Sequence, residues 1–261
     1  MTNSKKLYTR LQPINRVSVV DIQQMYDVFR RYYDLRDLDT FVRDLSKKTA
    51  IVIVRERESN RVVGFSTLLA MDIKVGGKTA RGVFSGDTIM EKEYWGSKAL
   101  NNRIAQYMFA EKLRNLGKPV YWMLISKGYK TFLLLTNNFM AYYPNRENRH
   151  PHLKKVVEHY CDRLFPGCYD EKTGVLDFGD RSMFLKGEVA GITEEMREAQ
   201  PNIAFFEERN PEWARGTELP CVGVLDMPNF LRFAMRAMKG KKSRKSTAAA
   251  FAQRAGVEST S

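Results

Sequence analysis

The chain has 261 residues, of which 43% are apolar and 11% aromatic, and it carries a formal net charge of +13. This composition predicts an ordered globular protein with a substantial core and excludes a chain that is disordered throughout. No apolar stretch reaches the roughly 18 residues of a spanning helix, and three cysteines are too few for a disulfide framework. Because the N-terminus also lacks the apolar run of a secretory signal, a cytoplasmic location is expected.

Two amphipathic helices are predicted near the N-terminus, over residues 21–33 and 37–45. In both segments apolar side chains recur at helical spacing, and Ser18 or Asp21 is available to cap the first helix. Packing of these apolar faces on a sheet explains the pattern without a functional role.

A series of strands and helices follows. Strands are predicted where β-branched and apolar residues form short runs, and helices where apolar spacing is helical and a stop signal such as Gly117 with Pro119 follows. The predicted strands are residues 49–55, 62–71, 80–90 and 120–126, and the predicted helices run from residue 91 to about residue 116 and over residues 129–139.

This order of elements resembles the GNAT (GCN5-related N-acetyltransferase) superfamily over about residues 11–144. The residues that carry the resemblance include Val63-Gly64-Phe65 and Trp95-Gly96. It implies an α/β (α+β) fold with a mixed, mostly antiparallel central sheet, helices on both faces, and a fourth and fifth strand that splay apart. It further implies acyl transfer from acyl-CoA, or from a phosphopantetheine-linked acyl thioester, to an amine or hydroxyl acceptor. The resemblance extends to divergent members of the superfamily whose donor is a carrier protein or a long-chain acyl thioester.

The turn after the fourth strand is where the resemblance implies binding of the donor's pyrophosphate, since amides at a helix N-terminus attract anions. The superfamily has Arg or Gln, two residues, Gly, one residue, and Gly or Ala there. This chain has Glu93 in place of the cation and Lys98 in place of the small residue. Glu93 would repel phosphate, whereas Lys92, Ser97 and Lys98 could bind it. An acidic acyl carrier protein therefore stands beside coenzyme A as a possible donor, because a basic chain attracts it.

The donor-binding residues implied by the resemblance lie on the two splayed strands and on this turn. They are Thr88, Ile89, Met90, Trp95, Gly96, Ser97, Lys98 and Ser126. The amides around Thr88 and Met90 would stabilise the oxyanion that develops on the thioester.

Acyl transfer needs a base for the attacking amine or hydroxyl. Glu91 is the first candidate and Asp87 the second, because carboxylates at the end of the fourth strand face the expected cleft; solvated strand-end charges are the alternative explanation. The superfamily's tyrosine acid falls on Leu134 when Phe139 is aligned. Tyr142 is the predicted substitute, with Tyr143 beside it as a second candidate and packing before the proline as the alternative explanation of both.

No metal is expected, although three histidines and two cysteines lie close together in the sequence. Imidazole and thiolate are preferred zinc ligands. His159 and Cys161, however, are two residues apart on a predicted helix and point to different faces.

A single domain is predicted over residues 1–238, with an insertion at about residues 145–200. Within that insertion, residues 153–165 predict an amphipathic helix. Residues 202–207 and 218–226 are expected to close the sheet as a hairpin.

The C-terminus is strongly basic. An amphipathic helix is predicted over residues 229–238, and residues 239–261 read as a disordered basic tail. Together they predict peripheral contact with an anionic membrane or an acidic protein.

Three functions remain open. The first is the acyltransferase, and the second is a catalytically silent protein that binds acyl thioesters or acyl carriers on the same fold, favoured by Leu134 and Glu93. The third is a basic nucleic-acid-binding protein. Specific nucleic-acid binding is not expected, because charge alone supports only non-specific contact and no recognition module is present.

Overall fold

The computed structural model describes residues 6–33, 37–179 and 191–229. The chain divides into two compact units, Met1–Leu225 and Asp226–Ser261. Of the second unit only residues 226–229 are described, so the basic tail predicted at 239–261 and nearly all of the helix predicted at 229–238 lie outside the described residues.

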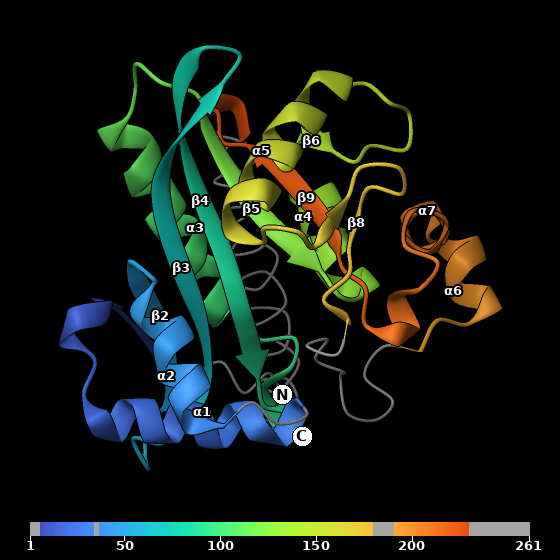
Figure 1. The fold of residues 1–261 in the computed structure, drawn as a ribbon. Coiled ribbons are helices and arrows are strands. Elements are labelled where there is room, and N and C mark those ends of the chain that lie inside the picture. Colours follow the sequence, from blue (N-terminus) through green and yellow to red (C-terminus); the bar gives the residue numbers. More distant parts are fainter. Residues whose placement is uncertain (1–5, 34–36, 180–190, 230–261) are drawn as a thin grey trace, which may run out of the picture. The chain divides into compact units, whose positions relative to one another are not determined.

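A seven-stranded sheet forms the centre of the first unit (Figure 1). Its order is β1-β2-β3-β4-β5-β9-β6; β4 and β5 are parallel, and every other neighbouring pair is antiparallel. The strands are β1 (Leu7–Pro13), β2 (Ala50–Glu56), β3 (Val62–Val75), β4 (Lys78–Met90), β5 (Val120–Ser126), β6 (Tyr142–Tyr143) and β9 (Leu219–Val224). The predicted fold class is confirmed, and β1 is an edge strand that was not predicted.

Helices α1 (Val19–Tyr32) and α2 (Leu38–Ser46) cover one face of the sheet. Phe29 and Phe41 lie in one buried cluster with Phe65 of β3 and Ile89 of β4. The Ser18 hydroxyl accepts a hydrogen bond from the Asp21 amide and caps α1, as expected. Both predicted N-terminal helices are confirmed.

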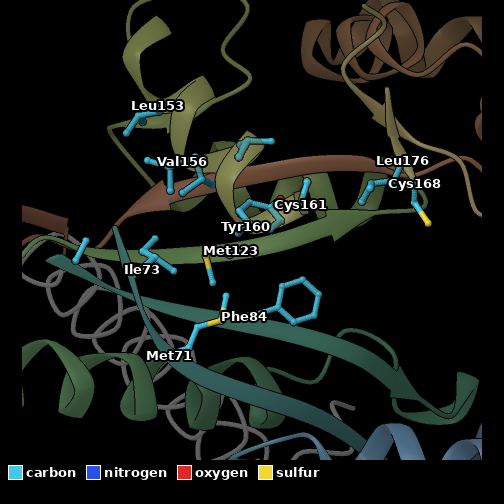
Figure 2. Close-up of a cluster of buried hydrophobic side chains, with 13 residues drawn as sticks. Met71, Ile73, Phe84, Met123, Leu153, Val156, Tyr160, Cys161, Cys168 and Leu176 are labelled. Carbon is cyan, nitrogen blue, oxygen red and sulfur yellow. The ribbon is translucent and has the colours of Figure 1, made fainter. Parts of the chain in front are cut away.

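Helix α5 (Lys154–Leu164) covers the same face farther along the sheet. Figure 2 shows Val156 and Tyr160 of α5 facing Met71, Phe84 and Met123 of the strands. Met71 and Phe65 are an even number of residues apart on β3, so their side chains share one face. The segment expected as an insertion at 145–200 thus supplies a large part of the core.

The opposite face carries α3 (Ala99–Arg114) and α4 (Tyr129–Asn138), which confirms helices on both faces. The Arg81 guanidinium of β4 donates to Glu111 of α3 at 2.8 Å. The rings of Trp122 on β5 and Phe139 at the end of α4 lie 5.1 Å apart. Helix α3 starts later than predicted because a short 3₁₀ turn (Lys92–Tyr94) and the left-handed Gly96, with φ of 82°, precede it.

The hairpin predicted from residues 202–207 and 218–226 is wrong in its first half. Residues 202–207 belong to helix α7 (Pro201–Arg209), which begins on a proline and buries Ile203 and Phe206 on one side. Phe206 packs against Phe132 of α4, with ring centres 6.0 Å apart. The second half is β9, whose partners are β5 and β6. The remaining elements are β7 (Tyr169–Asp170), β8 (Val175–Leu176) and α6 (Glu194–Ala199).

Among the described residues, no helix combines the length and the apolar composition needed to cross a bilayer.

Tyr160 is predicted to fasten α5 to the sheet. Its buried hydroxyl lies 2.9 Å from the Leu124 carbonyl oxygen and 3.0 Å from that of Cys221. Tyr160→Phe removes this donor, so we expect the free energy of unfolding to fall by about 1–2 kcal/mol. Urea unfolding measures the change, with Tyr121→Phe as the control. Equal effects of the two variants would contradict the assigned role.

Candidate functional site

The strands β4 and β5 separate at one end. They pair only from Arg81 with Val120 to Ser85 with Leu124. Beyond Ser85, residues 86–90 of β4 stay beside β3, while β5 runs on to Ser126 beside β9. Figure 1 shows the ends of the two strands pointing apart. The predicted splay is therefore confirmed.

A bulge in β4 accompanies this separation. Gly86 pairs with Thr67 and Ile89 with Phe65, so β4 holds one residue more than β3 across this stretch. Asp87 has a φ of 40°, in the left-handed region that aspartate tolerates better than most residues. A bulge bends its strand and increases the local twist, which accounts for the turn of β4 away from β5.

Asp87 sits on the face of the sheet that α1 and α2 cover. The Thr67 hydroxyl donates to the Asp87 carboxylate at 3.2 Å. The Lys48 ammonium lies 4.0 Å from the same carboxylate oxygen, and the two side chains are 16% and 28% exposed. Lys48 also lies over the Phe84 ring, 5.7 Å from its centre. Asp87 is therefore a partly exposed carboxylate at the base of the opening.

A second ion pair lies on the β5 side. Lys127, directly after β5, lies 3.0 Å from Glu218, directly before β9, and their side chains are only 13% and 8% exposed. The Lys127 ammonium lies 5.8 Å from the centre of the Tyr33 ring. Burial first, and then the charges of Glu218 and Asp87, raise the pKa of Tyr33 far above its ordinary value, so the phenol stays protonated at neutral pH.

We call these five residues the mixed-charge cluster: Tyr33, Lys48, Asp87, Lys127 and Glu218. Only Asp87 was predicted. The other four lie at the ends of elements that are far apart in the sequence. The pairing of Lys127 with Glu218 depends on that of Ser126 with Leu219, which the sequence does not disclose.

Glu91, the first predicted base, is buried and paired with two arginines, unlike the partly exposed Asp87. Arg31 of α1 and Arg61 of the β2–β3 turn each donate to its Oε1 at 2.6 Å, and its side chain is 7% exposed. The hydrogen bond to Glu91 also raises the pKa of Arg61. These contacts fasten α1 and the turn to the end of β4.

The turn before α3, where binding of the donor's pyrophosphate was predicted, leads into the N-terminus of a helix. The Ser97 hydroxyl accepts from the Ala99 amide at 3.3 Å, and Lys98 occupies the N-cap position without a side-chain capping bond. The first turn of α3 thus presents amide groups beside two exposed residues, Gly96 and Lys98. Such amides and the helix dipole favour an anion.

Trp95 links the two sides of the opening. Its indole donates to the Met90 carbonyl at 2.7 Å. Lys130, in the first turn of α4, lies 4.8 Å from the centre of the indole ring, and Lys92 lies 5.9 Å from it. Lys130 was not predicted, because only the fold brings α4 to the turn before α3.

Two predicted site residues are not brought to the opening in the way expected. The Ser126 side chain is fully buried, and its hydroxyl lies 3.8 Å from the Cys221 sulfur, on the β9 side. Tyr142 belongs to the edge strand β6 and pairs with Gly223. Two strands therefore lie between β4 and Tyr142, which places its phenol, whose pKa burial raises, apart from Asp87.

The remaining predicted residues belong to β4. The Thr88 hydroxyl lies 2.8 Å from that of Ser66, and the Ile89 side chain is buried in the core, so only its backbone is available to a ligand. In the part of the chain that the structure describes, no three His, Cys, Asp or Glu residues are grouped to hold a metal ion.

Comparisons with known proteins give similarity to solved structures alone. No family profile and no curated protein matches the chain. A probable N-acyltransferase from Enterococcus faecalis is 13% identical over 49% of this chain and 32% of that one, with a TM-score of 0.38. The Escherichia coli GNAT family N-acetyltransferase YhbS, in complex with CoA, is 14% identical over 47% of this chain and 63% of that one, with a TM-score of 0.33.

A third similar structure is an aminoglycoside acetyltransferase from an uncultured soil metagenomic sample, in complex with sisomicin. It is 12% identical over 53% of this chain and 91% of that one, with a TM-score of 0.38. The chain spans about a third of the length of the first of these proteins and less than two thirds of the second. The mostly antiparallel sheet and the separation of β4 from β5 are those that the resemblance to the GNAT superfamily implies.

Glu91→Gln is expected to destabilise the fold by about 1–3 kcal/mol, because it leaves two arginines without their shared carboxylate; their partial exposure keeps the loss below that of a fully buried pair. Urea unfolding tests this, with the exposed Glu93→Gln as the control. A Glu91→Gln variant as stable as the control would show that the ion pairs do not hold α1.

Proposed function

We propose that this protein is an acyltransferase that moves an acyl group from a thioester donor, acyl-CoA in the first instance, to an amine. The observation that carries the proposal is the separation of β4 and β5 beyond Ser85 and Leu124, directly beside the turn that precedes α3.

The opening suits a pantetheine arm. Beyond Ser85, the β5-facing edge of β4 pairs with no strand among the described residues, so its backbone groups can bond to the amides of an extended ligand. The donor's phosphates would then lie at the first turn of α3, with Lys98 and Lys130 supplying positive charge. Lys130 would supply the positive charge that the turn itself lacks, because Glu93 stands where the superfamily has a basic residue.

Asp87 is the proposed base in preference to Glu91. Its carboxylate is partly exposed at the bulge, whereas Glu91 is buried between two arginines. As the amine attacks the thioester carbon, Asp87 accepts a proton, and the C–S bond breaks as the tetrahedral intermediate collapses. The departing thiolate takes up a proton, so that the products are an amide and a free thiol, and Tyr142, separated from β4 by two strands, is given no part in this step.

An acidic acyl carrier protein is the second candidate donor. The exposed Lys92 and Lys98 beside Trp95 favour it, because they place positive charge around the same opening. Comparing an acyl-CoA with the same acyl group on a carrier protein separates the two donors by kcat/KM.

Thiol release tests the function directly. The full chain is incubated with acetyl-, octanoyl- and palmitoyl-CoA and a panel of amines, and free thiol is followed with a chromogenic thiol reagent. All three cysteines are buried, and burial raises the pKa of the Cys221 thiol to about 12, so the folded protein should contribute little background. Donor binding without amine-dependent thiol release would favour the catalytically silent protein.

Asp87→Asn should lower kcat by about 10²-fold or more, the contribution of a general base, with little change in the KM of the donor. Asp162→Asn, on the exposed side of α5, is the control and should keep full activity. Unchanged kcat in Asp87→Asn would remove Asp87 from the mechanism.

Lys130→Ala should weaken coenzyme A binding about fivefold, because one charge-assisted contact is lost. The loss should shrink as the salt concentration rises. Calorimetry measures the Kd, and Lys172→Ala, in the exposed β7–β8 turn, is the control. An equal Kd for both variants would contradict the assignment.

A further inference from the structure

The last turn of helix α1 is bonded to the turn that leads from β4 to α3. The Lys92 amide donates to the Tyr32 hydroxyl oxygen at 2.9 Å. The neighbouring Arg31 guanidinium donates to the Glu91 carboxylate at 2.6 Å. Two adjacent residues of α1 therefore hold two adjacent residues of the turn, across a sequence separation of 60 residues in each case.

We call residues 91–98 the donor turn, and its first half is also bonded within itself and to the sheet. The Tyr94 amide donates to the Glu91 carbonyl at 2.9 Å, and the Trp95 amide donates to the Lys92 carbonyl at 3.1 Å. The Tyr94 phenol donates to the Glu56 carboxylate of β2 at 2.8 Å. The backbone of residues 91–95 is thus fixed by several independent contacts.

The second half of the donor turn differs in this respect. None of the described residues accepts a hydrogen bond from the amide of Gly96 or Lys98. Gly96 has a left-handed φ of 82°, and the chain passes from there into the first turn of α3. A fixed half of the turn therefore leads directly into a half whose amides are available to an anion.

Helix α1 is a firm support for these contacts. Met25, Val28 and Phe29 on its inner face are at most 3% exposed. They belong to the buried cluster that packs on Phe65 of β3 and Ile89 of β4. Because this face is fixed on the sheet, the last turn of α1 keeps a constant position relative to the end of β4.

We propose that Tyr32 and Arg31 are positioning residues for the acyl donor. Through Lys92 and Glu91 they hold the donor turn in the conformation that presents its free amides to the donor's phosphates. This proposal rests on the proposed acyltransferase function, and it assigns neither residue a contact with the donor or with the reacting atoms.

Preorganisation is the physical reason for the effect. A turn that is ordered before binding loses little freedom when the donor arrives, whereas a loosened turn must be ordered at the expense of affinity. The proposed base is held by other contacts, since Asp87 bonds to Thr67 and pairs with Lys48. Loss of an α1 contact should therefore weaken donor binding and leave the chemical step unchanged.

Tyr32→Phe tests the first contact, because it keeps the ring and removes the acceptor oxygen. We expect the Kd of coenzyme A, measured by calorimetry on the full chain, to rise about fivefold, as does the KM of acyl-CoA, with kcat unchanged. Tyr121→Phe is the control, since its phenol lies at the end of β5 that is paired with β4. An equal Kd for the two variants would overturn the role of Tyr32.

Arg31→Gln tests the second contact and leaves Glu91 its other partner, Arg61. Because the variant also removes one positive charge, the matched control is Arg43→Gln, on the exposed side of α2. We expect the Kd of coenzyme A to be several-fold higher for Arg31→Gln than for Arg43→Gln. No difference between them would overturn the role of Arg31.

Hydrogen–deuterium exchange without ligand separates positioning from general stability. In Tyr32→Phe the amides of residues 92–95 should exchange faster, while those of residues 67–71 in β3 keep their protection. Loss of protection in both segments, or a fall in kcat together with the rise in KM, would show a purely structural role and overturn the proposal.

The positioning role and the acyltransferase function fail separately. Coenzyme A binding that Tyr32→Phe leaves intact would remove the positioning role and leave acyl transfer standing. Binding that Tyr32→Phe weakens, without thiol release for any amine, would support the positioning role although transfer had failed. No binding of coenzyme A to the unaltered chain would overturn the positioning role and leave a carrier protein as the remaining candidate donor.

Discussion

Five residue pairs join β4 to β5, and the proposed chemistry depends on their ending at Ser85 and Leu124. If the ladder continued to the end of β4, the backbone groups of β4 and β5 would hydrogen-bond to each other and would not be available to a ligand. The bulge at Asp87 prevents this, because an extra residue and a left-handed φ turn the strand away. The same bulge places the Asp87 carboxylate beside the end of the β4–β5 ladder. The separation of the strands and the position of the proposed base therefore have one origin.

The core supports the two sides of the opening separately. Phe29 and Phe41 of the N-terminal helices pack on Phe65 and Ile89, which hold the end of β4 beside β3. Tyr160 of α5 bonds to carbonyl groups of both β5 and β9 and keeps those strands together. Beyond the five paired residues, the end of β4 and the end of β5 thus each have supporting contacts of their own.

The four strands between residues 49 and 126 were predictable, whereas β1 was missed and residues 202–207 were assigned to a strand instead of a helix. Residues 120–126 were predicted with their observed bounds because a proline precedes this apolar run and Gly128 follows it closely. The apolar residues Ile203 and Phe206 fit a strand or a helix equally well in so short a segment, and Pro201 at its start decided for the helix.

The candidate site was only partly predictable for a different reason. Asp87 and Glu91 could be found because both are carboxylates at the end of a predicted strand. The pairing of Lys127 with Glu218 follows from the register of β5 on β9, and the contact of Lys130 with Trp95 follows from the placement of α4. Such contacts between distant segments leave no local pattern in the sequence.

Hydrogen–deuterium exchange with and without a bound acyl-CoA tests the central claim most directly. The claim is that the edge of β4 beyond Ser85, which pairs with no described strand, receives the thioester arm. It predicts that the amides of residues 86–90 and of the turn at 95–99 gain protection on binding, while those of residues 81–85, already paired with β5, stay unchanged. Binding that leaves residues 86–90 unprotected, or that protects a different part of the chain, would contradict it.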